Sequence, residues 1–238
     1  IKTQTKCIKA IRQNDIWLIT LENNLTGETY QVKSKSVVNA SGPWVAELFS
    51  QAMALKSPQN VRLIKGSHIV VPRIHDDPEA YMLQNIDQRI IFVIPFEDDF
   101  SLIGTTDVEY TGEPSEVKIS EEEIQYLLTI TNEYFKNKIS RDDIVTTYSG
   151  VRPLLDDESV DAQSVTRDYT LALEDINDKA PILSIFGGKI TTYRKLSEAA
   201  VDKLIPYFKT IGPQWTAKSP IPGGNFDDIK VFTEEVEN

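Results

Sequence analysis

The sequence SVVNASGPW, residues Ser36–Trp44, decides the fold. Its first half, around Val37 and Val38, predicts a short buried strand that ends in small residues. Pro43 suits the first turn of a helix, where its missing N–H needs no partner, and Trp44–Leu55 has helical spacing. A strand, a turn of small residues and a helix in this order are typical of an α/β nucleotide-binding sheet.

On both sides of this stretch the sequence predicts strands. Residues Ile8–Val38 contain β-rich apolar segments, with turns at Asn23-Asn24 and Thr26-Gly27. Downstream, polar turns separate four apolar segments, which predicts an antiparallel or mixed sheet. These segments are Ile69–Val71, Tyr81–Leu83, Ile90–Ile94 and Ser101–Gly104.

A helix and a second nucleotide-fold segment follow. Ser120 with Glu123 three residues later is a capping box, so a helix that covers one face of the sheet should begin there. Ile182–Phe186 predicts a buried strand, and a helix is expected from Thr192 until Pro206 stops it. The predicted fold class is α/β with mixed α+β character, a nucleotide-binding fold interrupted by an inserted sheet.

The composition excludes several classes of function. The 238 residues carry a formal net charge of −11, which argues against a general nucleic-acid-binding surface. No apolar run approaches the roughly 20 residues that a membrane-spanning helix needs. Cys7 is the only cysteine, which excludes an intrachain disulfide and a cysteine-built metal site and favours a reducing compartment. With two histidines and no paired ligand spacing, we expect no metal site.

The first motif with chemical meaning is the turn Gly187-Gly188-Lys189 after the predicted strand. Glycines let the backbone approach a ligand closely, and the following helix presents free N–H groups and the positive end of its dipole. Thr191 and Thr192 can cap that helix. A ligand-cradling turn and a plain strand-to-helix turn explain these residues equally well. The full P-loop pattern is missing, which disfavours ATP.

Arg152 is the second candidate. It lies between Gly150 and Pro153 at a strand end, and its planar guanidinium suits a pair of phosphate or carboxylate oxygens. A structural ion pair explains it at least as well. Arg167 is a further candidate, although Asp168 beside it offers a structural partner.

The two histidines differ in their setting. His68 opens an apolar strand, and an imidazole can accept a hydroxyl proton near neutral pH, although a lone histidine is more often structural. His75 lies in a polar loop, where we expect it to be solvent-exposed. Gly104–Asp107 follows a strand, and a structural or pocket-lining role is favoured there.

Five motifs occur in an order that resembles a known family. They are VVNASGPW at 37–44, RLIKGSHIVVP at 62–72, IGTTD at 103–107, YSGVRPL at 148–154 and FGGKITTYRKL at 186–196. Together they resemble the aerobic, FAD-dependent glycerol-3-phosphate dehydrogenases, within the glycine-oxidase and D-amino-acid-oxidase class of flavoproteins. The resemblance runs from about Ile1 to Gly224, and the chain looks like an internal fragment of such an enzyme.

The resemblance implies a domain plan and a reaction. Residues 1–44 would form part of an FAD-binding Rossmann-like domain, 45–157 a substrate-binding sheet domain, 158–205 the return to the FAD-binding domain, and 206–238 a linker toward a helical C-terminal domain. The implied reaction oxidises sn-glycerol 3-phosphate to dihydroxyacetone phosphate, with a hydride passing to FAD and electrons then to quinone. The alternatives are a glycerophosphate oxidase that uses O2 and a non-enzymatic phosphate-binding or interaction module.

The resemblance also implies roles for individual residues. The substrate would be bound by Arg152, Arg167, Lys189 and His68. Three of these, His68, Arg152 and Lys189, would act in catalysis, with His68 expected to accept the proton and Lys189 as its rival. Cofactor contacts are expected from Cys7, Ala40, Ser41, Gly42, Gly187, Gly188, Lys189, Ile190, Thr191 and Thr192. Ser41 stands where threonine is more familiar in the family, which keeps the hydroxyl.

The Gly-x-Gly-x-x-Gly turn that seats a dinucleotide pyrophosphate is absent from the sequence. We therefore expect this chain by itself to bind FAD weakly or not at all and to be inactive. The resemblance implies a cytoplasmic protein of glycerol metabolism that supplies the respiratory chain, with peripheral contact at the cytoplasmic face of the membrane. It leaves open whether the protein is a homodimer and whether quinone or O2 is the electron acceptor.

Overall fold

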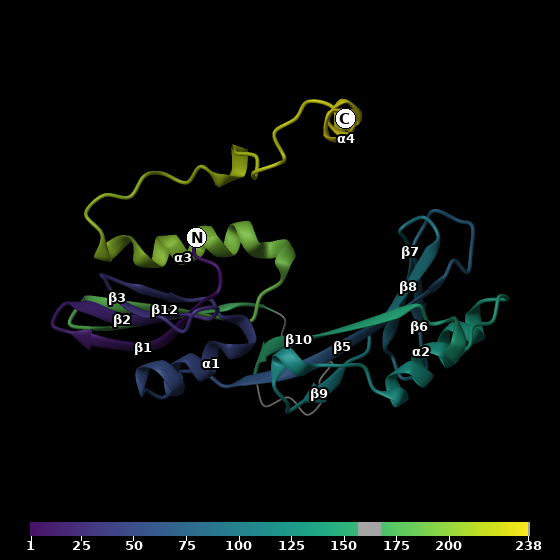
Figure 1. Cartoon of the computed structure of the whole chain (residues 1–238), viewed down its shortest axis with the longest axis horizontal. Helices are drawn as coiled ribbons and strands as arrows, with labels where there is room; N and C mark the ends of the chain where they lie inside the picture. The colour runs from purple at the N-terminus through teal and green to yellow at the C-terminus, as the bar shows by residue number, and fades with distance from the viewer. Residues whose placement is uncertain (157–167, 238) are drawn as a thin grey trace.

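The computed structural model describes residues 1–156 and 168–237, whose strands form three sheets with helices packed on them (Figure 1). The first sheet is an antiparallel meander of β1, β2 and β3, which span Thr5–Gln13, Ile16–Asn23 and Thr29–Ser34. The second has the order β11-β12-β4, from Thr170–Ile176, Lys179–Phe186 and Val37–Asn39. The predicted mixed α/β class is confirmed. The predicted domain limits stay a prediction.

Strand β12 is covered on both faces, as Figure 1 shows with α1 (Val45–Leu48) on one side and α3 (Tyr193–Leu204) on the other. On one side Ile182 packs with Trp17 and Phe49, and the indole Nε1 of Trp17 donates to the carbonyl oxygen of Ala180 at 2.9 Å. On the other side Leu183 packs against α3. Burial on both faces suits a strand that pairs in parallel, and β12 is indeed parallel to β4.

The helix predicted to follow β4 is broken into three short pieces. A 3-10 helix at Gly42–Trp44 leads into α1, Val45–Leu48, and then into a π-helical turn at Phe49–Met53. The helix predicted before Pro206 is confirmed as α3, Tyr193–Leu204.

The third sheet is antiparallel, with strands in the order β10-β5-β8-β7-β6 and β9 paired to β5. Its strands span Val61–Pro72 (β5), Tyr81–Gln84 (β6), Ile90–Phe96 (β7), Phe100–Gly104 (β8), Val108–Tyr110 (β9) and Thr146–Leu155 (β10). The four predicted apolar segments are β6, β7, β8 and part of β5. Strand β5 lies inside this sheet, paired with β10 along one edge and with β8 and β9 along the other.

Helix α2, Glu121–Tyr134, covers one face of the third sheet. The predicted capping box is confirmed: the Ser120 hydroxyl accepts from the backbone N–H of Glu123, whose carboxylate accepts from the N–H of Ser120. Leu127 packs in the buried core between the helix and the strands, together with Ile69 and Ile103.

The remaining elements are short. They are 3-10 helices at Pro114–Glu116, Arg141–Asp143, Ile190–Thr192, Ile205–Tyr207 and Thr216–Lys218, and the helix α4 at Ile229–Glu237. After α3 the chain runs back over this helix toward α4 (Figure 1). Within the described residues, every helix is too short or too polar to cross a lipid bilayer.

Leu127→Ala should lower the free energy of unfolding by about 2–5 kcal/mol, because Leu127 has no exposed surface and truncation leaves a cavity under the sheet. Leu25→Ala is the matched control. Leu25 is 77% exposed, so the same truncation should change the unfolding free energy by less than about 0.5 kcal/mol. Urea unfolding of both variants checks this, and equal losses would contradict the assignment of the core.

Candidate functional site

The candidate site lies on the face of the third sheet opposite α2. Side chains alternate between the two faces of a strand, so Gly66 and His68 of β5 share one face. In the paired strand β10, Gly150 lies opposite Gly66 and Tyr148 lies opposite His68. Arg152, two residues beyond Gly150, projects to the same face, where it comes close to Gly66.

The imidazole of His68 is held between two strands. On one side it stacks on the ring of Tyr148, with ring centroids 4.7 Å apart and planes 12° from parallel. On the other side it lies over Gly104 of β8, where a Cβ atom would clash with the imidazole. Glycine is therefore required at position 104 if the ring is to keep this place.

Electrostatics keep this imidazole neutral. Burial, together with the positive charge of Arg152, lowers the pKa of His68 below its ordinary value of 6.5. Its Nδ1 atom is buried and has no hydrogen-bond partner among the described residues. A neutral imidazole at neutral pH is a competent proton acceptor.

The guanidinium of Arg152 is fixed by two acceptors from the segment after β8. Its Nη1 donates to Asp107 Oδ1 at 2.5 Å, and its Nη2 donates to Thr105 Oγ1 at 3.0 Å. Only 30% of the Arg152 side chain is exposed. The predicted structural ion pair is therefore present, and it uses two of the five N–H groups that a guanidinium carries.

A second group of predicted residues lies where β4 and β12 end. Asn39 and Ser184 are in register in this parallel pair, so Ala40–Gly42 and the turn after Phe186 leave the sheet at the same edge. The carboxyl ends of the strands are the usual ligand position in open α/β sheets. Both glycines of the turn, Gly187 and Gly188, have positive φ, and a Cβ on Gly187 would come within 2.7 Å of the Asp168 carbonyl oxygen.

The tip of this turn points into solvent. Lys189, Ile190 and Thr191 are exposed, and Ile190 is exposed by 88%. The predicted side-chain cap of the helix is wrong, because the Thr192 hydroxyl donates to the carbonyl oxygen of Lys189 at 2.8 Å and makes no capping bond.

A cavity of about 770 Å³ opens beside the end of β4. Three of the residues predicted to contact a cofactor line it, namely Cys7, Ala40 and Ser41. Trp44 also lines it, and its indole Nε1 donates to Glu113 Oε1 at 2.9 Å, although the two residues are far apart in the sequence. The volume falls in the range of small-molecule and cofactor sites.

The structure thus brings some predicted residues together. His68 and Arg152 lie on one sheet face. Of the predicted cofactor residues, Cys7, Ala40 and Ser41 line one cavity, and Gly187–Thr192 follow the end of β12. A Cβ on Gly187 would lie 3.8 Å from the Pro153 carbonyl oxygen. The turn before Lys189 therefore borders the end of β10, the strand that carries Arg152. Arg167 lies outside the described residues.

The expectation for His75 is wrong. The residue is half-buried, and both of its ring nitrogens are buried without a hydrogen-bond partner among the described residues. The ring packs edge-on against Tyr81 with centroids 4.9 Å apart and stacks on Phe135 at 5.7 Å. A polar loop sequence does not show that two aromatic rings from elsewhere will cover its histidine. Among the described residues no acidic, histidine or cysteine cluster could hold a metal ion.

Sequence reasoning missed the role of Tyr148 as the surface on which His68 stacks. The signal is present in the two-residue spacing of Tyr148, Gly150 and Arg152, which places all three on one strand face. It also missed Trp44 and Glu113 at the cavity, because their contact joins distant segments of the chain.

Comparison with known proteins decides the family. A family model described as "FAD dependent oxidoreductase" matches residues 1–194. The chain belongs to the FAD-dependent oxidoreductase family.

Three members of this family illustrate the similarity. The chain is 58% identical to the aerobic glycerol-3-phosphate dehydrogenase of Escherichia coli over 224 residues, 94% of this chain and 45% of that protein. It is 45% identical to the D-erythritol 1-phosphate dehydrogenase of Brucella abortus, over 94% of this chain and 44% of the relative. The glycerol-3-phosphate dehydrogenase of Bacillus halodurans, solved with FAD, superposes with a TM-score of 0.82 at 27% identity, over 98% of this chain and 44% of that one. The chain therefore spans less than half the length of these relatives.

The residues at the β4–β12 edge fit the family's cofactor. Two small residues that border the cavity at the end of β4, Ala40 and Ser41, and a turn of two glycines with positive φ are features that let a backbone approach a dinucleotide closely. Ala40, Ser41 and Gly187–Thr192 would hold it. Lys189 would add a positive charge there.

Gly104→Ala should displace the imidazole of His68 from its position over residue 104. The new methyl group would clash with the ring, which would then move toward solvent, and the pKa of His68 should rise toward 6.5. Gly150→Ala is the control, since a Cβ there meets no atom within 4 Å. NMR titration of the two histidines measures both effects. An unchanged His68 titration in Gly104→Ala would contradict the geometry.

Proposed function

We propose that this chain forms part of the catalytic machinery for oxidising sn-glycerol 3-phosphate to dihydroxyacetone phosphate by hydride transfer to FAD, with electrons passing on to quinone. The observation that carries the proposal is the 58% identity, over 94% of this chain, to a protein named as an aerobic glycerol-3-phosphate dehydrogenase. The paired placement of His68 and Arg152 supports it, because the reaction needs a proton acceptor and a cationic group at the same substrate.

Arg152 is proposed to orient the substrate. Its guanidinium is held on one side by Asp107 and Thr105, which fixes the direction of its remaining donors. Because Asp107 neutralises much of its charge, binding of a phosphate dianion requires further cations. Lys189 on the exposed turn, together with Arg167, is proposed to supply them.

His68 is proposed to accept the proton of the C2 hydroxyl. Bound FAD would supply the hydride acceptor, and the protein contribution is to hold the hydroxyl against a base that is neutral when the substrate arrives. The lowered pKa of His68 meets that requirement. Lys189 remains the rival base.

We also propose that the protein lies at the cytoplasmic face of the membrane, as a peripheral protein.

A longer polyol phosphate is the second candidate substrate, since a relative named as a D-erythritol 1-phosphate dehydrogenase is 45% identical to the chain. The higher identity to the glycerol-3-phosphate enzyme favours the three-carbon substrate.

The protein expressed from its complete reading frame should bind FAD and reduce a quinone-like dye with glycerol 3-phosphate. We expect a lower kcat/KM with D-erythritol 1-phosphate, and little peroxide in the presence of O2. Peroxide formed in step with substrate oxidation would identify an oxidase instead. A flavin-loaded protein that neither substrate reduces would refute the proposal.

His68→Asn in that protein should lower kcat by about 10²–10⁴-fold, the usual contribution of a positioned base. In the unmodified protein, kcat/KM should fall as the pH drops through an apparent pKa below 6.5, because protonation of His68 removes the acceptor. Lys189→Met is the matched variant and should chiefly raise KM. Loss of the pH dependence in Lys189→Met, with its retention in His68→Asn, would make Lys189 the base.

A further inference from the structure

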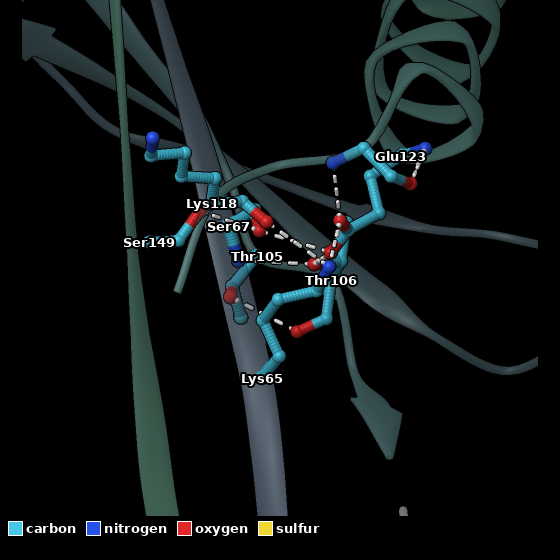
Figure 2. Close-up of polar contacts among 8 residues, drawn as sticks. Lys65, Ser67, Thr105, Thr106, Lys118, Glu123 and Ser149 are labelled. Atoms are coloured by element: carbon cyan, nitrogen blue, oxygen red, sulfur yellow. Dashed lines mark hydrogen bonds and ion pairs between the residues drawn. The ribbon is translucent and has the colours of Figure 1, made fainter. Parts of the chain in front are cut away.

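On the α2 side of the sheet, a buried carboxylate, Glu123, is held by polar side chains that include Lys65, Ser67 and Thr106 (Figure 2). Glu123 is only 4% exposed although it belongs to the first turn of α2. One oxygen, Oε2, accepts from the Lys65 ammonium at 2.7 Å and from the backbone N–H of Ser120 at 2.8 Å. The other, Oε1, accepts from the hydroxyls of Thr106 at 2.6 Å and Ser67 at 2.9 Å.

Apart from the N–H of Ser120, which belongs to the start of α2, these donors come from two segments of the sheet, and a third segment is joined to them. Lys65 and Ser67 belong to β5, and Thr106 belongs to the connection after β8. Because the Ser67 hydroxyl donates to Glu123, it accepts the 2.9 Å bond that links it to Ser149 of β10. A single carboxylate is thus bonded, directly or through one hydroxyl, to three segments of the sheet.

Each of these network residues is the immediate neighbour of a residue of the candidate site. Ser67 precedes His68, and Thr106 stands between Thr105 and Asp107, the two acceptors of Arg152. In β5 the alternation of side chains along a strand sends these neighbours to opposite faces. In the connection after β8 the contacts show the same arrangement, because Thr105 and Asp107 bond to Arg152 whereas Thr106 bonds to Glu123. The groups that hold the network behind the sheet therefore fix the backbone from which the site residues project in front.

The two oxygens of Glu123 have different tasks. Helix capping and charge balance account for Oε2, which contacts the N–H of Ser120 and the ammonium of Lys65. Neither accounts for Oε1, which is occupied by hydroxyls from the site-bearing segments. Thr106 Oγ1 also accepts from the backbone N–H of Ser67 at 2.9 Å, so the two segments are joined to each other as well as to the carboxylate.

We propose that Glu123 is a positioning residue for the site on the opposite face, setting the places of His68 and Arg152 through Ser67 and Thr106. The inference rests on the proposed function for its catalytic meaning, but the positioning itself is a property of this chain. Glu123 touches neither substrate nor cofactor in this role. It keeps the acceptors of Arg152 at a fixed distance from the imidazole.

Glu123→Ala in the 238-residue chain tests this, with His68 as the reporter. Without the carboxylate the Thr105–Asp107 segment should loosen, Arg152 should move away from the imidazole, and the pKa of His68 should rise toward 6.5 in an NMR titration. Glu121→Ala is the matched control from the same helical turn. Its side chain is 73% exposed and pairs with Arg141 at the surface, so His68 should titrate as in the unmodified chain.

His75 serves as the internal marker of a retained fold, since it lies in a different aromatic cluster. A folded Glu123→Ala chain with an unchanged His68 titration would overturn the inference. If that variant does not fold, Thr106→Val and Thr106→Ser decide the question, because valine keeps the shape of threonine without its hydroxyl and serine keeps the hydroxyl. A shifted titration in the valine variant alone supports the inference, and unshifted titrations in both refute it.

The test separates this inference from the proposed function. It needs neither FAD nor substrate, so a failed oxidation assay leaves its outcome standing. Conversely, an unchanged His68 titration removes the role of Glu123 and leaves the proposed reaction untouched.

Discussion

Two glycines, Gly66 of β5 and Gly104 of β8, are the constraint on which the candidate site depends. A Cβ on Gly66 would clash with the guanidinium of Arg152. Missing side chains on this face create the space that a cation and an imidazole then occupy. Gly104, one strand further along, does the same beneath His68. The site is a gap in the side-chain layer of a sheet.

Such a gap weakens the sheet locally, since glycine contributes no side-chain packing and is the most flexible residue in a strand. The opposite face offsets that loss with a dense set of charge-assisted hydrogen bonds around Glu123. Desolvation by burial raises the pKa of this carboxyl, but the bonds from Lys65, Thr106, Ser120 and Ser67 outweigh it, so the pKa lies below its ordinary 4.5. The carboxylate thus stabilises the fold above about pH 4.5, and this stability is lost as the pH falls below that value.

The sequence was sufficient where local chemistry decides the structure. The capping box at Ser120 and the end of α3 before Pro206 depend on residues a few positions apart, and both predictions are confirmed. Contacts between distant segments were not accessible in this way. The sequence around His75 does not indicate that Tyr81 and Phe135 pack against its ring. Likewise, the sequence around Glu123 does not indicate that Ser67 and Thr106 donate hydrogen bonds to it. The resemblance to a flavoenzyme family suggested which residues to consider for the site, whereas their mutual geometry required the fold.

The parallel pairing of β4 with β12 has a consequence for biosynthesis. All six strands of the third sheet lie between these two partners in the chain, so β4 leaves the ribosome long before the strand that will bind it. At about 5–20 residues per second, that delay amounts to roughly 7–30 seconds. The antiparallel sheet, whose strands are contiguous apart from its own loops, has time to form in the interval. Until β12 arrives, the side of β4 that will pair with it at Val37 and Val38 lacks this partner, so the nascent chain presents that strand edge to chaperones and to neighbouring chains.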